Sequence, residues 1–540
     1  MPIMMSLLYL TLAISAALGD ASIIGQRGND RTVKLSPANS LSGLSIQHAP
    51  SFSSFSIEPA FWLDFVGTAD EPNDLFFKLI SQMTKRGGRP ILRPGGIAMD
   101  SLVFDPEGDD LVRTMGPKGE VYRTTVGPGY YKSWSNFPEG VSFVSTLNFG
   151  NNSLEIARDL AVASAKYQAE RISFFELGNE PNHFPKSRWN YSTKSYVDQW
   201  KDWTSEIDEA VADAVVELPS DYAPIKWWAS SATTDPSDLK VRPVDLIPEG
   251  IDSEDQVGQF SIHSYVYNSC TPEGAAEATI ENLLNHTQIV TFADQEVRPS
   301  AEEARKHGKP WVMGEFNSVA CSGKPNVTDT FTQALWMIDT QLTYAVLNAT
   351  SVNQHQGATL VLQSDSQTNT PGFSTYSFVY PRDSEKHGEA RALPSFSGVL
   401  FLTEVFAKPN GRIKRLDTPP NVDPDRFATY AVYQGDRVDK LVLLNMKPYY
   451  HKSSKMDTHL TVDVSTFITH KQKFTERPTF KRLTAPSVDE KDTNKVTWAG
   501  QSFKNGDARG KRIVERLGKN GVLNIRASEA ILVEFGSESD

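Results

Sequence analysis

Eight short apolar runs alternate with amphipathic segments between residues 50 and 370, and this alternation limits the possible folds more than any other feature. The runs are rich in Val, Ile, Phe and Trp without strict alternation, which is typical of strands buried on both faces. They span 54–57, 90–93, 142–147, 172–177, 225–229, 259–263, 310–314 and 358–363. Eight strand–helix units predict a (β/α)8 barrel of the α/β class, in which chemistry lies at the C-terminal ends of the strands.

The pattern changes at about residue 395. Shorter runs at 427–433, 440–444, 460–464, 495–498, 512–517, 522–525 and 531–535 are typical of strands, and Gly-Lys-Asn-Gly at 518–521 is a strong hairpin signal. This part predicts an antiparallel β-sandwich domain. With 540 residues, the chain is longer than one core usually accommodates. We expect a signal peptide (1–19), an N-terminal segment that joins the β-domain (20–50), a catalytic barrel (51–390) and a C-terminal β-sandwich (391–540).

An apolar run at residues 4–18 is followed by Gly19. It is too short to span a bilayer and is typical of a secretory signal peptide, with a buried N-terminal helix as the alternative. No other apolar run is long enough to span a membrane, so we expect a secreted, extracellular protein. Glycosylation sequons of the form Asn-x-Ser/Thr favour the same location. They begin at Asn151, Asn190, Asn285, Asn326 and Asn348.

The chain has two cysteines, Cys270 and Cys321. An even pair in a secreted protein favours a disulfide, whereas two buried thiols are the alternative. Cys270 follows the sixth expected strand and Cys321 the seventh, and adjacent barrel strands place the loops that follow them side by side. The strand order therefore predicts a disulfide between these two residues.

The net charge of −12 argues against a nucleic-acid-binding surface or any other general polyanion-binding surface. It also argues weakly against a sulfated polysaccharide as substrate. The sequence contains no Gly-rich phosphate loop and no Gly-x-Ser-x-Gly or His-Glu-x-x-His motif, and its histidines lack metal-ligand spacing. We therefore expect no cofactor and no metal, and we infer no obligate protein partner.

Two of the expected strands lead to a glutamate. Glu180 follows the fourth strand, directly after Asn179, and Glu315 follows the seventh. In a closed barrel these positions face each other across the central cleft. Glycosidic bond cleavage needs two carboxyl groups, one that protonates the leaving oxygen and one that attacks the sugar or activates water. A helix cap or a surface charge would explain one such glutamate, but two at matching strand ends favour a glycosidase.

Four segments resemble motifs of glycoside hydrolase family 79, which contains β-glucuronidases and heparanases. Phe-Glu-Leu-Gly-Asn-Glu-Pro-Asn at 175–182 resembles the acid/base motif, and Gly-Glu-Phe-Asn-Ser at 314–318 resembles the nucleophile strand. Arg-Pro-Gly-Gly-Ile-Ala-Met-Asp at 93–100 and Ile-His-Ser-Tyr at 262–265 resemble the motifs of strands two and six. The resemblance implies that Glu180 is the acid/base and Glu315 the nucleophile of a retaining enzyme.

The same resemblance implies roles for further residues. Asn179 would bind the sugar 2-hydroxyl, and Tyr265 would donate a hydrogen bond to Glu315. Arg93 would also stabilise the charge of Glu315, with an interior ion pair as the alternative reading. Glu58, at the end of the first strand, would bind sugar hydroxyls at the far end of the −1 subsite.

The stretch His-Gln-Gly at 355–357, which precedes the expected eighth strand, resembles the family loop that binds the substrate carboxylate. Gln356 and Gly357 are therefore expected at the substrate, because glycine lets backbone N–H groups approach an anion closely. Heparanases carry a Gly-Gly-like pattern at this place, and this chain departs from it.

Together these features predict a secreted retaining exo-β-glucuronidase that removes terminal β-D-glucuronic acid, with or without a 4-O-methyl group, from glycans such as arabinogalactan-type chains. The nearest alternative is an endo-β-glucuronidase of the heparanase type. The acidic net charge and the lack of an evident excised linker disfavour it. A third alternative is a catalytically silent carbohydrate-binding protein on the same fold, which the presence of both glutamates disfavours.

Overall fold

The computed structural model describes residues 32–38, 40–116, 121–215, 225–359, 372–451, 459–469 and 477–536. From Thr32 onward the chain forms one compact unit. The expected signal peptide, residues 1–19, lies outside the described residues. Among the helices that are described, none is long and apolar enough to cross a bilayer.

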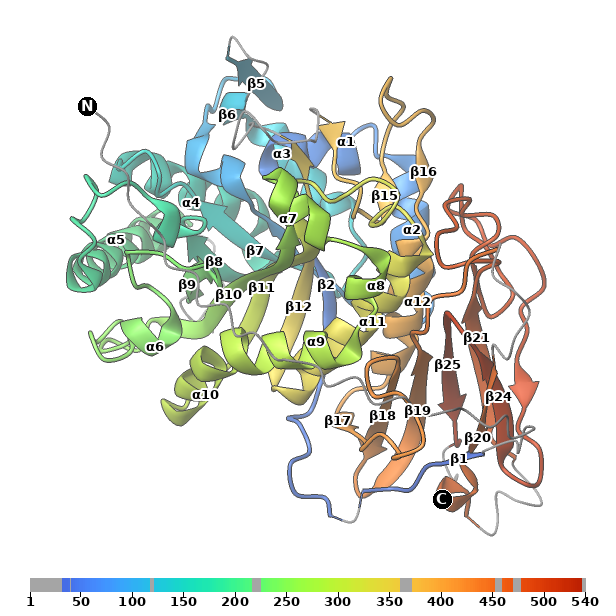
Figure 1. Cartoon of the computed structure of the whole chain (residues 1–540). Helices are drawn as coiled ribbons and strands as arrows, with labels where there is room; N and C mark the ends of the chain where they lie inside the picture. Colours follow the sequence, from blue (N-terminus) through green and yellow to red (C-terminus); the bar gives the residue numbers. More distant parts are fainter. Residues whose placement is uncertain are drawn as a thin grey trace, which may run out of the picture. The chain divides into compact units, whose positions relative to one another are not determined.

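Eight parallel strands close into a barrel (Figure 1). In chain order they are β2 (Ser53–Ile57), β3 (Ile91–Pro94), β7 (Ser142–Leu147), β8 (Ile172–Leu177), β9 (Lys226–Thr233), β10 (Val257–Asn268), β11 (Trp311–Ala320) and β12 (Ala349–Gln356). Each strand pairs with the next, and β12 pairs with β2. The predicted (β/α)8 barrel is confirmed.

Helices surround the barrel (Figure 1). The larger ones are α2 (Asp74–Thr84), α4 (Leu154–Gln168), α5 (Thr193–Ala214), α10 (Arg298–Lys306), α11 (Phe331–Val346) and α12 (Ser395–Phe406). Six shorter helices are α1 (Trp62–Val66), α3 (Pro128–Lys132), α6 (Pro243–Leu246), α7 (Pro272–Glu277), α8 (Ile280–Leu283) and α9 (His286–Phe292). Val197, Trp200 and Ile207 recur at helical spacing on α5 and are buried, which explains why this long helix packs with one face inward.

The eighth strand differs from its prediction. We expected it at 358–363, but β12 ends at Gln356, and residues 360–363 lie outside the described part of the chain. The strand reads Ala-Thr-Ser-Val-Asn-Gln-His-Gln, so an apolar run did not identify it. Its polar side chains are buried; for example, Asn353 Nδ2 donates to the carbonyl of Met313 at 3.1 Å.

Three further features of the barrel and its insertions were not predicted. The seventh strand, β11, continues to Ala320, so Glu315 lies inside it rather than at its end. A small sheet of β4 (Leu102–Phe104), β6 (Val121–Val126) and β5 (Leu111–Met115) is inserted after β3. Two short strand pairs follow β12, and they consist of β13 (Ala358–Thr359) with β14 (Gly372–Phe373) and β15 (Val379–Tyr380) with β16 (Arg391–Ala392).

The C-terminal part contains two sheets. The larger has the order β17 (Arg412–Arg415), β18 (Phe427–Gln434), β19 (Arg437–Asn445), β25 (Glu529–Glu534), β21 (Thr479–Thr484) and β22 (Thr497–Trp498), and β23 (Glu515–Arg516) also pairs with β21. The smaller has the order β1 (Val33–Lys34), β20 (His459–Asp463) and β24 (Val522–Arg526). Apart from β1, which pairs in parallel with β20, the neighbours in both sheets are antiparallel.

The larger sheet is buried on both faces. Along β18, Tyr430 and Val432 belong to the core cluster that includes the barrel, whereas Ala431 and Tyr433 belong to the cluster shared with the smaller sheet. This follows from the two-residue period of a strand. The helix α12 is buried along its whole length and contacts α11 and β2 as well as β21 and β22. The expected domain boundary at residue 391 therefore falls before the last barrel helix.

The prediction of a hairpin at 518–521 is wrong, because the strands on either side of the turn do not pair with each other. The turn forms, with Gly521 N–H donating to the carbonyl of Gly518 at 2.9 Å. However, β23 before it pairs with β21 in the larger sheet, and β24 after it pairs with β20 in the smaller one. The turn thus carries the chain from one sheet to the other. The strands β17 and β21 had no counterpart in the sequence prediction.

Candidate active site

Glu180 follows β8 in a left-handed backbone conformation, with φ of 50°. Non-glycine residues rarely adopt this conformation, and those that do cluster at functional sites. Its N–H donates to the carbonyl of Ser231 on β9 at 3.0 Å, and Pro181 then begins the 3-10 helix Pro181–His183. This turn ends the strand abruptly and leaves the Glu180 side chain 23% exposed in a cleft.

Glu315 lies on β11 beside His263 on β10, and the two residues are in register. Its side chain is only 6% exposed. One carboxylate oxygen of Glu315, one of Glu180 and a ring nitrogen of His263 all lie within 4.8 Å of one another. Carboxyl groups stand about 5–5.5 Å apart in retaining glycosidases and about 6.5–9.5 Å apart in inverting ones. The observed spacing is close to the retaining value.

Arg93, at the end of β3, lies beneath these carboxylates and is fully buried. Its Nη1 donates to Glu315 Oε2 at 2.7 Å, and its Nε forms an ion pair with Glu176 inside β8. Its Nη2 donates to Asn179 Oδ1 at 3.0 Å. One guanidinium therefore orients Glu176 on β8, Asn179 after it and Glu315 on β11, which combines the two readings of Arg93 that the sequence left open.

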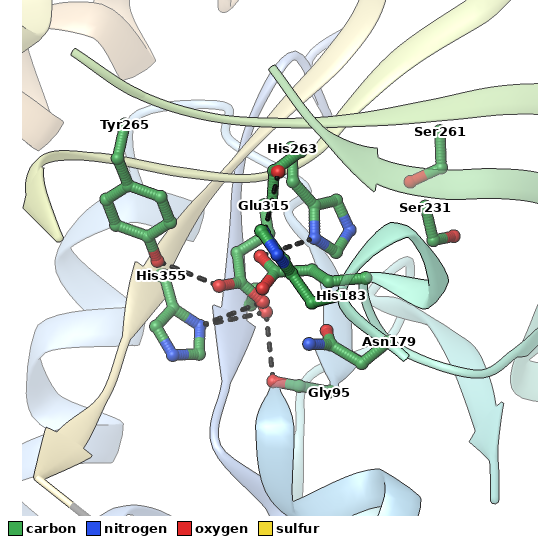
Figure 2. A network of polar contacts seen from close by, with 12 residues as sticks. Gly95, Asn179, His183, Ser231, Ser261, His263, Tyr265, Glu315 and His355 are labelled. Carbon is green, nitrogen blue, oxygen red and sulfur yellow. Dashed lines mark hydrogen bonds and ion pairs between the residues drawn. The ribbon is translucent and has the colours of Figure 1, made fainter. Parts of the chain in front are cut away.

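The surroundings of Glu315 favour its ionised form. Burial alone would raise the pKa of its carboxyl, but the charges of His355, His263 and Arg93 outweigh burial, and the Tyr265 hydroxyl donates to Oε1 at 2.8 Å. The pKa of Glu315 is therefore held below its ordinary value. Figure 2 shows Tyr265 and His355 on one side of Glu315 and His263 on another. A carboxylate kept ionised in this way has the property that a nucleophile needs.

His263 joins the two halves of the site. Its Nδ1 lies 3.2 Å from Glu180 Oε1, and its Nε2 lies 3.9 Å from Glu176 Oε1. Burial and the charge of Arg93 work against protonation of the ring, but these two carboxylates and Glu315 raise the pKa of His263 above its ordinary value. The imidazole is thus placed to donate to Glu180 and to fix its carboxylate.

Glu58 closes the other side of the cleft, directly after β2. Its Oε1 accepts from the N–H of Ala98 at 2.8 Å, and its Oε2 lies 3.7 Å from His355 Nε2. Burial raises the pKa of Glu58 despite these partners. Gly96 has φ of 146°, and a Cβ on it would lie 2.4 Å from Glu58 Oε2, so only glycine fits beside this carboxylate.

Gln356 and Gly357 do not occupy the place that the sequence suggested. They end and follow the eighth strand rather than precede it, and neither belongs to the lining of the cleft. The Gln356 side chain is fully buried, and its Oε1 accepts from the N–H of Phe378 at 2.9 Å, which holds the following segment in place. A Cβ on Gly357 would lie 2.8 Å from both His355 Nε2 and the Tyr376 hydroxyl, so this glycine allows both side chains to reach the cleft.

Asp100 anchors the segment that carries the acid/base candidate. Its half-buried carboxylate accepts from the N–H groups of Asn179 (3.0 Å), Phe149 (3.2 Å) and Gly150 (3.0 Å). These N–H groups belong to the segments that follow β7 and β8. Burial raises the pKa of Asp100 to about 7 even though these donors and Arg188 lower it.

The cleft around the pair has a volume of about 750 Å³, enough for a sugar and part of its neighbour. Among the described residues, its lining includes Glu58, Asn179, Glu180, Tyr265 and Glu315. Glu180, His263 and Glu315 are also a possible metal-binding group by their spacing. However, Arg93 donates a hydrogen bond to Glu315, and His263 lies at hydrogen-bond distance from Glu180. The carboxylate oxygens and the ring nitrogen that would bind a metal are therefore already engaged in hydrogen bonds.

Comparisons with known proteins agree with this geometry. Residues 429–532 match the glycosyl hydrolase family 79 C-terminal beta domain. A β-glucuronidase of Aspergillus niger is 25% identical over 430 residues, covering 75% of this chain and 73% of that protein. A β-glucuronidase of Neurospora crassa is 24% identical over 426 residues, covering 73% and 72%. The chain is thus similar to glycoside hydrolase family 79 in its C-terminal β-domain and to two fungal β-glucuronidases over about three quarters of its length.

Solved structures of glycoside hydrolases share the fold of this chain. A 4-O-α-L-rhamnosyl-β-D-glucuronidase from Fusarium oxysporum 12S superposes with a TM-score of 0.73 at 20% identity, covering 93% of this chain and 99% of that one. A family 51 arabinofuranosidase from Xanthomonas axonopodis pv. citri superposes with a TM-score of 0.55 at 10% identity, covering 94% and 99%. Both similarities extend over the barrel and the β-domain.

The sequence did not identify several polar residues of this site. They are Asp100, Glu176, His263, His355 and Tyr376. Glu176 offered a usable signal, because a carboxylate in the middle of a buried strand requires a cationic partner. Asp100, His263 and His355 lie within the recognised motifs, but their contacts depend on the closure of the barrel, and Tyr376 lies outside those motifs.

The predicted disulfide forms between Cys270 and Cys321 and joins the loops after β10 and β11 at the rim of the cleft. The sequon asparagines differ in exposure. Asn151, Asn190 and Asn326 are exposed, whereas Asn285 and Asn348 are half-buried. Asn285 caps α9, and Asn348 Oδ1 accepts from the N–H of Ile46 at 2.8 Å, so these two side chains already have structural partners.

Proposed function

We propose that this protein is a retaining exo-β-glucuronidase that releases terminal β-D-glucuronic acid, with or without a 4-O-methyl group, from glycans. The observation that carries the proposal is the carboxylate pair, with oxygens of Glu180 and Glu315 within 4.8 Å in a cleft of this fold. The choice of sugar rests on the two β-glucuronidases that this chain resembles over about three quarters of its length.

In the first step, Glu315 attacks the anomeric carbon while Glu180 protonates the departing glycosidic oxygen, which gives a covalent glycosyl-enzyme. In the second step, Glu180 takes a proton from water, the water attacks the same carbon, and Glu315 leaves. Asn179 Oδ1 is held by Arg93, which leaves the amide nitrogen to donate to the sugar 2-hydroxyl. His263 fixes Glu180 for both proton transfers.

The sugar carboxylate requires donors on the Glu58 side of the pair. No Lys or Arg is found among the described residues that line the cleft. We infer that neutral donors bind this group, with the Tyr376 hydroxyl beside His355 as the best placed. Exo action is supported by the buried Glu58, which lies beside His355 on the Glu315 side of the pair, whereas Asp235 lies on the Glu180 side.

The test is hydrolysis of p-nitrophenyl β-D-glucuronide compared with the β-glucoside and β-galactoside. We expect kcat/KM to favour the glucuronide by a factor on the order of 10³ or more, because a site built to bind a polar group rejects analogues that lack it. Glu315→Gln abolishes turnover, and the exposed Glu170→Gln serves as the matched control. Preference for the glucoside would contradict the proposal, and sugar binding without hydrolysis of any aryl glycoside would favour a silent binding protein.

A further inference from the structure

A second groove continues from the cleft on the acid/base side. It has a volume of about 530 Å³, and it shares Asp235, Tyr265, Val266 and Tyr267 with the lining of the cleft. Asp235 lies 3.8 Å from His183, three residues after Glu180. The groove therefore begins beside the carboxyl that protonates the leaving group, and this is the side on which a leaving group, the aglycone, must lie.

The groove is built for a polar, hydroxyl-rich ligand. Asn282 and Gln288 line it, and the Tyr267 ring forms part of its wall. The Tyr267 hydroxyl lies 3.1 Å from Gln288 Oε1 and 3.2 Å from the carbonyl of Asn282, which fixes the ring. Amides that accept and donate beside an aromatic face suit sugar rings, which present hydroxyls at their edges and C–H groups on their faces.

The charged side chains of the groove all have one sign. Asp235, Glu277 and Glu296 line it, and no Lys or Arg does so within the described part of the chain. Glu296 is partly neutralised by Arg242 at 3.7 Å, whereas Glu277 on α7 is exposed. An anionic group bound here would meet these carboxylates, and Arg242, which lies near Glu296 and Asp235, offsets them only in part.

We propose, on the basis of the proposed glucuronidase function, that this groove is an aglycone subsite for neutral oligosaccharides and that its carboxylates exclude aglycones bearing sulfate or uronic acid. A like charge a few ångströms away in partly solvated surroundings disfavours binding by about 3–5-fold per carboxylate. Two or three such carboxylates therefore give a preference of about tenfold or more. The enzyme accordingly releases glucuronic acid from neutral chains rather than from sulfated ones.

The experiment uses two matched substrates, a β-glucuronide of a galactose disaccharide and the same compound with one sulfate on the distal galactose. We expect wild-type kcat/KM to favour the neutral substrate by about tenfold at low ionic strength. In 1 M NaCl, where the screening length is about 3 Å, this ratio approaches one. Equal hydrolysis of both substrates at low salt, or a preference for the sulfated one, would overturn the proposal.

Substitutions of single glutamates test whether the carboxylates of the groove cause this preference for the neutral substrate. Glu277→Gln lowers the neutral-to-sulfated ratio by about 3–5-fold, and Glu277→Lys lowers it further. Glu273→Gln is the matched control, because Glu273 is also exposed on α7 but does not line the groove. A ratio that is unchanged in Glu277→Lys contradicts the subsite. Failure to hydrolyse p-nitrophenyl β-glucuronide would remove the proposed function itself, whereas hydrolysis of that compound without discrimination between the disaccharide substrates removes only this inference.

Discussion

At the scale of single residues, the site depends on charges that hold one another in place. Arg93 is fully buried and forms ion pairs with both Glu176 and Glu315. A buried charge without partners is strongly unfavourable, so each of these residues requires the others. The consequence is a nucleophile candidate that stays ionised in a buried site, with His263 lying between it and Glu180.

Tyr265→Phe tests the control of the Glu315 charge. The Tyr265 hydroxyl donates to Glu315 and helps to hold its pKa below the ordinary value, so removal of the hydroxyl raises that pKa. Because Glu315 must be ionised to attack, the acid limb of the kcat/KM profile moves to higher pH, by about one pH unit.

Tyr344→Phe is the control for this pH measurement. It removes another buried hydroxyl, which lies 3.2 Å from Ser264 Oγ and does not contact Glu315. We expect its acid limb to match that of the wild type. An unchanged limb in Tyr265→Phe would show that this hydrogen bond does not set the ionisation of the nucleophile.

The sequence was sufficient to predict those site residues that stand next to an apolar run in the chain. Asn179, Glu180 and Glu315 follow or interrupt apolar runs, and the strand count placed them on facing strands. Partners from other strands remained hidden. His263 on β10 contacts Glu176 on β8 and Glu180 after it, although β9 lies between these strands in the closed barrel.

At the scale of elements, the strand ends are held by hydrogen bonds to loops from neighbouring units. Asp100 lies in the segment after β3, and it accepts from backbone N–H groups after both β7 and β8. Three successive units of the barrel are thereby joined at the edge where Glu180 projects. We infer that Asp100 is a positioning residue, because it reaches the acid/base candidate only through the backbone of Asn179.

Asp100→Ala is expected to lower kcat by about 100-fold, because three N–H groups lose their acceptor and a shift of about 1 Å in Glu180 has an effect of that size. Asp100→Asn keeps one carbonyl oxygen as an acceptor and restores part of the loss. KM changes less than kcat in both variants. Asp105→Ala, which alters a carboxylate in an exposed turn, is the control. Wild-type kcat in Asp100→Ala would contradict a positioning role.

Strands with polar inward faces were the hardest elements to predict. β12 is buried although it contains Asn353, Gln354 and His355; Asn353 Nδ2 donates to the carbonyl of Met313, and His355 lines the cleft. Because the prediction relied on apolar runs, it placed the eighth strand about one strand length too far along the chain. By contrast, β7 and β8 have the bounds that the sequence predicted, because their buried faces are mainly apolar.

At the scale of the whole molecule, the β-domain is packed onto the barrel by apolar and charged contacts together. Glu404 on α12 lies 3.2 Å from Arg86 and accepts from Trp498 Nε1 of β22 at 2.8 Å. It also forms an ion pair with Lys481 of β21. Burial would raise the pKa of Glu404, but Lys481 outweighs burial and lowers it.

We expect calorimetry to show a single unfolding transition for the barrel and β-domain. Glu404→Ala leaves Lys481 less well paired, which costs about 3 kcal/mol and lowers Tm by about 3 °C for a chain of this size. Glu404→Gln retains acceptors and loses less, and the exposed Glu385→Ala is the control. Two separate transitions would contradict this description.

The pH dependence of the same variants follows from the lowered pKa of Glu404. A carboxyl with a lowered folded pKa stabilises the fold above its ordinary pKa, and this contribution is lost as the pH falls towards the folded value. The difference in Tm between wild type and Glu404→Gln should therefore shrink below about pH 4.5. A difference that stays constant with acidification would rule out a charge-based contribution.

The stereochemistry of hydrolysis tests the central claim most directly, because it reports on the roles of Glu180 and Glu315 together. Proton NMR can follow the first minutes of p-nitrophenyl β-D-glucuronide hydrolysis, before the anomers equilibrate. With these carboxylates within 4.8 Å, we expect the β-anomer of glucuronic acid to form first and the α-anomer to follow only by mutarotation. Initial release of the α-anomer would mean inversion and would contradict the assignment of Glu315 as the nucleophile.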